Sequence, residues 1–335
     1  MGYFRWVVGA ARRRLGRAVH DLGGATRSDM RALQSEIQQL RGQLSSLAAA
    51  TEWTRDLEAR QGALSTRVDS LAGAQREVDA RLASIETMVA IDTFSRFIRY
   101  ARLRTEPLIT VVLPTYNRPD CLRRAIDSVI AQRYPRWELI VVDDGGSADC
   151  ESVAEEASDS RVRWTRISHG GAGAARNAAL EIASGEIIAY VDDDNLMDPD
   201  WLFSVAWAFE QHPEIEVLYG AFMIDDVLRV NSQSSGQLPR TFLHPWNREV
   251  LRKGNLADIG AIAHRAGLAE ARFDDSLVQM ADWDLLLRLT EERDPLVLPA
   301  IACYYMTDAP DRLTLGPTQA ADFAVVSARA AQAGE

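Results

Sequence analysis

The sequence has few of the features that mark secreted or membrane-spanning proteins. Its three cysteines, Cys121, Cys150 and Cys303, are odd in number and far apart, so they form no zinc pattern and no disulfide framework. No apolar run approaches the roughly 20 residues that a membrane-spanning helix needs. The apolar stretch from Trp6 to Ala11 is short and lacks a cleavage site for a secretory signal. We therefore expect a cytoplasmic protein.

Lysine is almost absent, and positive charge is concentrated at one end of the chain. Lys253 is the only lysine, a bias that indicates genomic base composition. Residues 1–105 hold 17 arginines and 11 acidic residues, whereas residues 106–335 hold 20 basic and 37 acidic ones. General nucleic-acid binding needs a basic surface, so we expect no nucleic-acid partner.

Proline is missing from residues 27–92, which are rich in Ala, Leu, Arg, Glu and Gln and predict a long helix. Apolar residues alternate spacings of four and three in two runs: Leu33, Ile37, Leu40, Leu44 and Leu47, and then Leu64, Val68, Leu71, Gln75, Val78, Leu82, Ile85 and Val89. Such runs are typical of coiled coils, and we expect a homo-oligomer. The two registers differ by three residues, which predicts a stammer near Ala48–Thr54 and local overwinding.

The segment before this helix, residues 1–26, is basic and aromatic. Within residues 1–22, Tyr3, Phe4 and Trp6 stand among several arginines. Such a segment can lie in a membrane interface, which suggests peripheral contact with the inner face of a membrane. A solvated tail is the alternative, and the two readings predict different behaviour with anionic vesicles.

From Leu108 onward, apolar strands alternate with amphipathic helices. Strands are predicted at 108–113, 137–142, 162–167, 187–191, 259–263 and 296–304, and helices at 119–130, 172–183, 199–211, 282–289 and 318–333. The alternation predicts an α/β fold, a Rossmann-like and mostly parallel sheet with helices on both faces. We expect this domain at 106–310 and a helical tail at 311–335. Residues 225–256 are polar and predict a long loop or lid.

Three consecutive aspartates, Asp192, Asp193 and Asp194, directly follow the apolar run that ends at Val191. Like charges this close repel one another unless something positive neutralises them. Carboxylate oxygens suit Mg²⁺ or Mn²⁺, and open α/β sheets bind ligands at the carboxyl ends of their strands. The cluster therefore predicts a metal site, against the alternative of a plain solvated turn.

Other predicted strands also end in polar residues. The first ends at Pro114-Thr115-Tyr116-Asn117 and the second at Asp143-Asp144. Carboxyl ends of parallel strands meet at one edge, so we expect a single site there. The glycines at 170–173 begin a helix whose amides can point at a phosphate, with Arg176 adding positive charge. They follow the third strand instead of the first, which argues against a nicotinamide-binding motif.

At this point the chain resembles family 2 glycosyltransferases of the GT-A fold. The resemblance covers about 108–305 and rests on several motifs in order: Val111–Arg118, Leu139–Gly145, Gly173–Asn177, Ala183–Asp194, Phe273–Leu277 and Asp282–Leu289. It does not cover the coiled coil.

The resemblance implies a role for each matching residue. Asp192 and Asp194 hold Mg²⁺ or Mn²⁺ against the donor diphosphate, with Asp193 near the donor ribose. The other nucleotide-sugar contacts that it implies are Pro114, Thr115, Tyr116, Asn117, Asp143, Asp144 and Arg176. Asp282 is the catalytic base, which takes a proton from the acceptor hydroxyl and gives inversion at the anomeric carbon. A helix N-cap is the structural alternative for Asp282.

The chain departs from the family pattern in three places. Ala281 stands where an acidic residue usually precedes the base. The turn after Asp144 is lengthened to Gly145-Gly146-Ser147, and Met306-Thr307-Asp308 replaces a segment that often carries a histidine contact to metal or phosphate. His244 and His264 are the remaining histidine candidates.

The expected function is transfer of a sugar from a nucleotide-diphosphate sugar to a glycan, lipid or protein acceptor. His244 and Trp246, with Phe242, are candidate acceptor contacts in the 225–256 loop. The alternative is a coiled-coil scaffold whose transferase domain binds a nucleotide sugar with little or no turnover, and fold alone does not distinguish the two.

Overall fold

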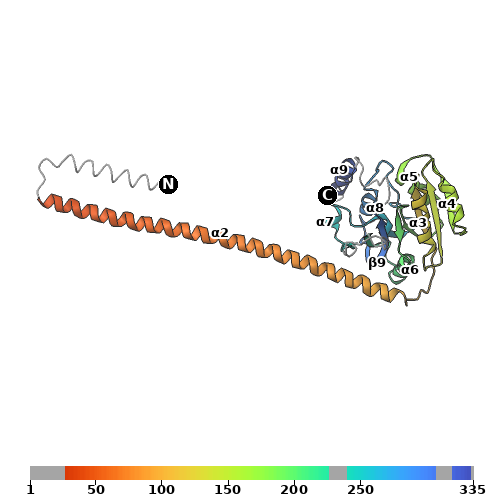
Figure 1. The fold of residues 1–335 in the computed structure, drawn as a ribbon, viewed down its shortest axis with the longest axis horizontal. Coiled ribbons are helices and arrows are strands. Elements are labelled where there is room, and N and C mark those ends of the chain that lie inside the picture. The colour runs from red at the N-terminus through yellow and green to blue at the C-terminus, as the bar shows by residue number, and fades with distance from the viewer. Residues whose placement is uncertain (1–26, 226–239, 307–318, 333–335) are drawn as a thin grey trace. The chain divides into compact units, whose positions relative to one another are not determined.

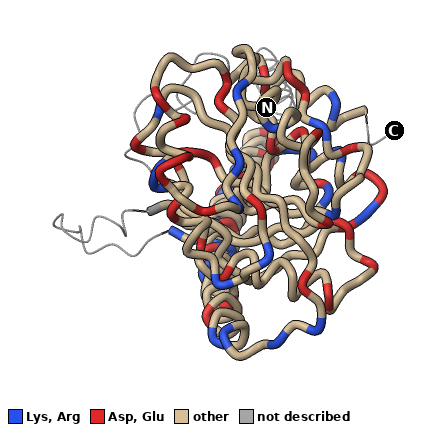
Figure 2. The backbone as a smooth tube through the Cα atoms, turned by 90° about the vertical axis from the view of Figure 1, so that its right-hand side faces the viewer, with Lys and Arg blue, Asp and Glu red and all other residues tan. Residues whose placement is uncertain are grey.

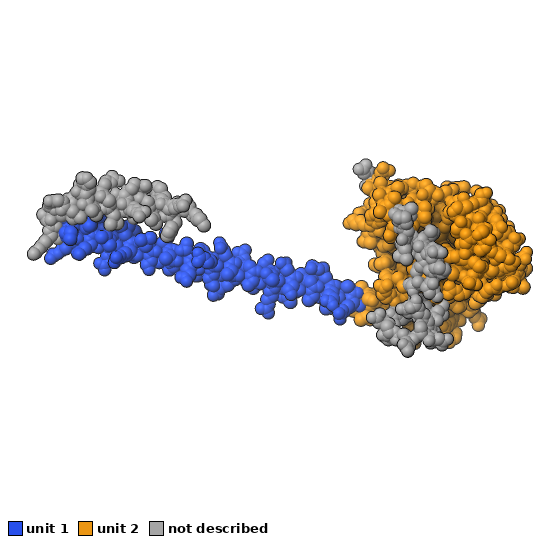
Figure 3. All heavy atoms as spheres, turned by 45° about the horizontal axis from the view of Figure 1, so that its top comes forward, with its two compact units in different colours: residues 1–81 blue, residues 82–335 orange. Residues whose placement is uncertain are grey.

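The computed structural model describes residues 27–225, 240–306 and 319–332. The chain divides into two compact units, residues 1–81 and 82–335 (Figure 3). The expected basic segment at 1–26 lies outside the described residues. Asp and Glu residues occur beside Lys and Arg residues along the chain of the globular unit (Figure 2).

One uninterrupted helix, α2 (Arg27–Ile98), carries the whole predicted coiled-coil sequence and continues six residues past its expected end (Figure 1). The residues of its second apolar run are exposed, from 53% at Leu82 to 64% at Leu64. The helix is thus confirmed, while pairing with another chain stays a prediction. Among the described residues, none of the helices is apolar enough over a sufficient length to cross a bilayer.

The last turns of α2, from Leu82 onward, belong to the globular unit and pack against the rest of it. Ile91 and Ile98 are buried, and Phe94 and Phe97 each meet the ring of Trp207 edge-on, with centroids 5.5 and 5.3 Å apart. Arg133 also donates a hydrogen bond to the carbonyl of Ile98 at 2.9 Å. These contacts fix the end of the helix to the rest of the globular unit.

The globular unit is built on one sheet, whose strands follow the order β3-β2-β1-β4-β8-β6-β9-β5, with β7 paired to β6. The strands are β1 (Ile109–Thr115), β2 (Trp137–Asp143), β3 (Val162–Arg166), β4 (Ile187–Tyr190), β5 (Asn195–Met197), β6 (Val217–Asp225), β7 (Arg240–Phe242), β8 (Ile262–Arg265) and β9 (Leu296–Met306). β1 pairs in parallel with β2 and β4, and β2 pairs in parallel with β3. Their carboxyl ends therefore meet at one edge, as the sequence predicts.

Helices cover both faces of this sheet. Successive residues of a strand point to opposite sides, and the central strands are apolar on both sides, so both faces need covering. Val111 and Leu113 of β1 join one core cluster, and Val112 joins the other. The first cluster packs against α3 (Pro119–Ile130), α4 (Cys150–Glu156) and α6 (Trp201–Gln211). The second packs against α5 (Gly171–Ile182), α7 (Arg248–Leu251), α8 (Ala281–Leu289) and α9 (Gln319–Gln332). The α/β class is confirmed.

The second half of the sheet differs from the mostly parallel arrangement expected. β8 pairs antiparallel with β4 and β6, and β5 pairs antiparallel with β9. The strand expected at 259–263 begins as a 3₁₀ turn at Ile259–Ala261 and continues as β8. Of the expected loop at 225–256, residues 226–239 lie outside the described residues, and the following part contains β7 and α7.

Candidate active site

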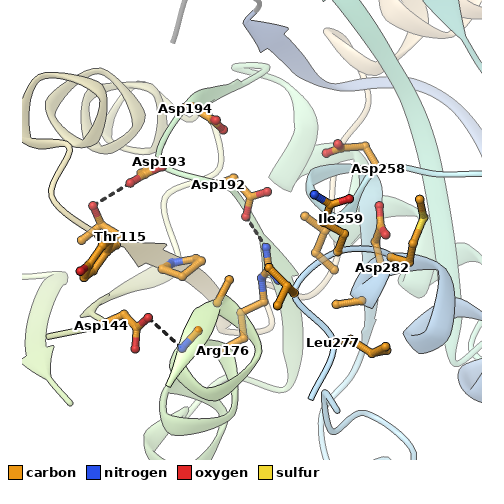
Figure 4. A pocket seen from close by; sticks show the side chains of 18 of the residues that line it. Thr115, Asp144, Arg176, Asp192, Asp193, Asp194, Asp258, Ile259, Leu277 and Asp282 are labelled. Carbon is orange, nitrogen blue, oxygen red and sulfur yellow. Dashed lines mark hydrogen bonds and ion pairs between the residues drawn. The ribbon is translucent and has the colours of Figure 1, made fainter. Parts of the chain in front are cut away.

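A cavity of about 990 Å³ opens at the edge where β1, β2 and β4 end. All the residues that line it belong to the globular unit. Most of the residues named by the sequence motifs line it together: Pro114, Thr115, Tyr116, Asn117, Asp144, Arg176, Asp192, Asp193, Asp194, His244 and Asp282 (Figure 4). Strands distant in sequence thus bring the predicted residues into one site.

The three aspartates after β4 differ in exposure. The Asp192 and Asp194 side chains are 27% and 13% exposed, whereas the Asp193 side chain is 1% exposed. Asp193 accepts a hydrogen bond from the Thr115 hydroxyl at 2.7 Å. The two outer carboxylates therefore have the greater access to the cavity, and the middle one fixes the end of β1 to the end of β4.

Arg118 neutralises part of this cluster, a role that the motif reading did not assign. Its guanidinium reaches Asp193 at 2.9 Å and Asp194 at 2.9 Å. Burial nevertheless raises the pKa of Asp193 to about 7, although Arg118 and Thr115 oppose the shift. Arg118 lies just before α3, so its part in the site depends on the close approach of the β1 and β4 ends.

Asp143 and Asp144 have different environments. Asp143 is fully buried, accepts from Gly146 at 2.9 Å and pairs with Arg166 at 2.7 Å, and it is not among the residues lining the cavity. Asp144 lines the cavity and accepts from the amides of Gly170 at 2.7 Å and Gly171 at 2.9 Å. The first amides of α5, expected to point at a phosphate, are thus bonded to Asp144.

The loop after β1 is held by Asn117, whose φ of 56° is left-handed, a conformation that asparagine tolerates better than most residues. Its side-chain oxygen accepts from the amides of Ser147 at 2.6 Å and Ala148 at 2.9 Å. Tyr116 stacks on His169 with ring centroids 4.5 Å apart. The β1 and β2 loops are therefore joined around one wall of the cavity, and Tyr116 supplies an aromatic surface there.

Arg176 pairs with a different member of the aspartate cluster from Arg118, and its side chain is only 8% exposed. It pairs with Asp192 at 2.5 Å, and its buried Nε has no hydrogen-bond partner. Burial disfavours the charge of Arg176, but Asp192 and then Asp282 keep its pKa above the ordinary value. The guanidinium of Arg176 is therefore a fixed positive charge that interacts with both Asp192 and Asp282.

Asp282 occupies the first turn of α8 and faces this cation across the cavity (Figure 4). Its oxygens accept from the Asn255 amide at 2.8 Å and from the backbone amide of Trp283 at 2.9 Å. Burial raises the pKa of Asp282, although the Trp283 amide and Arg176 oppose the shift. The residue at the N-cap is Met280, and α8 begins at Ala281, so Asp282 is not the N-cap of this helix.

Asp258 is a further acidic residue at the cavity that sequence reasoning did not identify. Its Oδ1 accepts from the amide of Gly260 at 2.9 Å and lies 3.7 Å from the Cys303 sulfur. Burial, and then the charges of Asp192 and Asp282, raise its pKa to about 7. No local pattern marks Asp258, because its neighbours come from β4, α8 and β9. The three cysteines are free and buried.

The histidine and aromatic candidates separate in the structure. His244 lines the cavity, whereas Phe242 stacks on Phe222 at 5.1 Å. Trp246 is not among the lining residues and has Arg248 over its ring at 5.5 Å. His264 is buried and bonded to the Tyr190 hydroxyl at 2.7 Å, and burial lowers its pKa to about 4, so it is a core residue.

The glycosyl transferase family 2 model matches residues 110–273, which include the strand-end motifs of this site. WcaA of Escherichia coli K12, assigned to colanic acid biosynthesis as a glycosyl transferase, is 30% identical over 196 residues, 57% of this chain and 68% of WcaA. The chain belongs to glycosyl transferase family 2. The globular unit is therefore a family 2 glycosyltransferase domain.

The chain is also similar to a second curated relative and to a solved structure. WfgD of Escherichia coli, a UDP-Glc:α-D-GlcNAc-diphosphoundecaprenol β-1,3-glucosyltransferase, is 39% identical over 90 residues, 27% of this chain and 36% of WfgD. The structure of Staphylococcus aureus TarS 1–349 in complex with UDP-GlcNAc has a TM-score of 0.55 at 19% identity, covering 67% of this chain and 66% of that one. The latter shows a shared GT-A fold. The chain spans less than two thirds of the length of several curated relatives, down to 14% for one.

Proposed function

We propose that the globular unit is an inverting, metal-assisted glycosyltransferase in which Asp282 is the general base. The observation that carries the proposal is the place of the Asp282 carboxylate. It lines the same cavity as Asp192 and Asp194, and two donors, Asn255 and the Trp283 amide, hold it in position. The cavity thus offers carboxylates both for the donor, Asp192 and Asp194, and for the acceptor hydroxyl, Asp282.

Asp192 and Asp194 would hold a divalent cation. Their donor set is hard carboxylate oxygen, which fits Mg²⁺ or Mn²⁺, and their side chains have more access to the cavity than Asp193. Among the residues that the structure describes, no group of three acidic, histidine or cysteine side chains forms a metal site. A donor diphosphate would supply further oxygen ligands to a cation held there. When bound, such a cation stabilises negative charge on a departing diphosphate.

Asp282 removes the proton of the attacking hydroxyl. A sugar hydroxyl is a weak nucleophile, and a carboxylate within hydrogen-bond reach makes it a stronger one. The raised pKa of Asp282 makes this carboxylate a stronger base than an ordinary aspartate. One base opposite the leaving group gives a single displacement with inversion. Arg176, fixed beside Asp192, binds negative charge on the donor.

The donor that we propose is a uridine-diphosphate sugar, since WfgD uses UDP-glucose by its name and is 39% identical to this chain over 90 residues. Thr115, Tyr116, Asn117 and Asp144 form the nucleoside side of the cavity. Asp143 supports this side from behind through Arg166 and Gly146.

The acceptor is a glycan, lipid or protein, approached past His244. Trp246 does not line the cavity, and its contact with the acceptor stays a prediction. Peripheral membrane contact through residues 1–22 and a cytoplasmic location remain predictions. The scaffold alternative keeps donor binding and lacks turnover, so turnover distinguishes the two.

The test is hydrolysis of UDP-sugars, with GDP- and dTDP-sugars for comparison, in the presence of Mn²⁺. Asp282→Asn should lower the hydrolysis rate by about 10²- to 10⁴-fold while donor affinity changes little, because the amide cannot take the proton. Glu291→Gln is the matched control, since this exposed carboxylate does not line the cavity. Equal rates for native protein and Asp282→Asn would instead favour the scaffold.

A further inference from the structure

The helix α2 carries an apolar stripe, which we call the seam and whose C-terminal run is exposed. It consists of two runs: Leu33, Ile37, Leu40, Leu44 and Leu47, followed by Leu64, Val68, Leu71, Val78, Leu82, Ile85 and Val89. In the second run each apolar side chain is more than half exposed. Isolated helices gain little stability from propensity alone, so an apolar stripe this long indicates a missing packing partner.

The globular unit does not cover the seam even where it binds the helix. The buried residues Ile91 and Ile98 fall at c positions of the second heptad register, and Phe94 falls at f. Positions c and f lie opposite a and d on a helix. Leu82, Ile85 and Val89 hold the a and d positions of the same turns and stay 53–58% exposed. One face of the helix end docks on its own unit, and the other remains available.

We infer that the occupant of the seam is a second copy of this chain, and that the two α2 helices form a parallel, in-register, two-stranded coiled coil. The choice of two strands follows from the residues at the core positions. Leucine dominates the d positions, as at Leu64 and Leu71, while β-branched Ile37, Val68 and Val89 hold a positions. This combination favours dimers.

The charges beside the seam favour the parallel orientation. In the second run the g positions carry Arg60, Arg67 and Arg81, and the e positions carry Glu58, Asp79 and Glu86. In a parallel pair, each g position faces an e position of the other helix, so Arg81 meets Glu86 of its partner. In an antiparallel pair, g faces g and e faces e, which would bring arginine towards arginine and carboxylate towards carboxylate.

The break in the seam supports the same register. The d positions Leu47 and Leu57 are ten residues apart instead of seven, so the stripe shifts by three residues there. The break lies on the N-terminal side of the middle of α2. Of the two pairings that overlap along the whole of α2, only the parallel, in-register one places the two breaks opposite each other. In an antiparallel pair, each break would face an intact stretch of the other seam.

Association is tested first on the full chain by sedimentation velocity and light scattering. Native protein should have twice the mass of one chain, and the seam variant Leu71→Glu with Ile85→Glu should have the mass of one chain, with affinity weakened at least 100-fold. Ala63→Glu with Ala80→Glu adds the same charges at c and f positions and should remain a dimer. Circular dichroism and donor hydrolysis on each variant show whether the globular unit stays folded.

Orientation is tested by single cysteines at Leu47→Cys and, separately, Ile85→Cys under mild oxidation. Both d positions should form covalent dimers with their own copies, because parallel helices bring identical d residues together. Native protein is the background control, since its three cysteines are buried. Failure of both variants to cross-link, a native mass of one chain or of more than two chains, or an unchanged mass of the seam variant would overturn the inference.

Discussion

At the scale of single residues, the cavity balances buried carboxylates against two arginines. Arg118 pairs with Asp193 and Asp194, and Arg176 pairs with Asp192. None of the arginines that the structure describes pairs with Asp258 in this way. Its Oδ1 accepts a hydrogen bond from the Gly260 amide, and the charges of Asp192 and Asp282 that act on it are negative. Ionising Asp258 in the folded protein therefore costs free energy, so the stability of the fold should depend on pH.

We predict that Asp258→Asn stabilises the fold in a pH-dependent way. Folding raises the pKa of Asp258 from 3.8 to about 7, so the folded state favours the protonated carboxyl. That contribution is complete below about pH 4 and is lost as pH rises through 7. The full shift corresponds to at most ~4 kcal/mol, and solvent in the cavity reduces this to about 2 kcal/mol. The amide variant avoids the loss.

Denaturant unfolding of native protein and Asp258→Asn at pH 5 and pH 8 measures this difference. Because part of the contribution is already lost at pH 5, the variant should gain about 1 kcal/mol on the native protein between the two pH values. The exposed Glu292→Gln serves as the control and should follow the native curve at both. A constant difference across this range would show that Asp258 ionises in the fold as freely as in the unfolded chain.

The sequence predicted the residues of the local motifs and missed those defined by distant contacts. Asp192–Asp194 and Thr115 lie at strand ends that apolar runs mark clearly, and they meet as expected. Arg118 and Asp258 interact with residues far away in the chain. Arg118 pairs with Asp194, about 75 residues later, and Asp258 is affected by Asp192, about 65 residues earlier. Spacing along a sequence carries no signal for such pairs, so they emerge only from the folded chain.

At the scale of elements, α5 is tied to the segment before α8 by one amide side chain. Asn177 donates to the Phe273 carbonyl at 2.9 Å and accepts from the Phe273 amide at 2.8 Å. It also donates to Asp275, which lines the cavity, at 2.6 Å. A buried side chain thus satisfies a backbone donor and acceptor that no strand pairing provides.

Asn177→Ala should lower the free energy of unfolding by about 3 kcal/mol, because it leaves the buried Phe273 amide and carbonyl unpaired. For a unit of this size that corresponds to a fall of about 10 °C in the melting temperature. Glu181→Ala, on the exposed side of the same helix, should change stability by less than about 0.5 kcal/mol. Differential scanning calorimetry compares the two, and a loss in Asn177→Ala no larger than in the control would contradict this account.

The elements themselves were predictable to the extent that their residues repeat. α3 and β1 carry long, regular apolar patterns, and their observed bounds lie close to the expected ones. β5 and β7 are three residues long, too short to show a period, and they exist because β9 and β6 offer them backbone partners. The second half of the sheet mixes antiparallel pairings of β8 with a parallel pairing of β6 and β9, which could not be read from the local pattern.

At the scale of the whole molecule, the cavity and both core clusters lie within residues 82–335. Ile91, Phe94 and Ile98 of α2 belong to this unit: the two isoleucines are buried, and Phe94 packs against Trp207. The part of α2 before Leu82 contributes no residue to either cluster or to the cavity lining. Catalysis and association are thus assigned to different stretches of one chain.

We predict that a chain starting at Leu82 keeps its donor-hydrolysis rate within about twofold of the full-length rate per chain and melts within a few degrees of it. It should also lose self-association, because Leu82, Ile85 and Val89 span fewer than two heptads, too short for a stable coiled coil. A chain starting at Pro107 should melt lower, since the buried end of α2 is then missing and its apolar partner surface is exposed. Comparing both chains by calorimetry, hydrolysis and sedimentation separates the roles of the helix. A more than tenfold loss of hydrolysis in the first chain, with its fold intact, would show that catalysis depends on the coil.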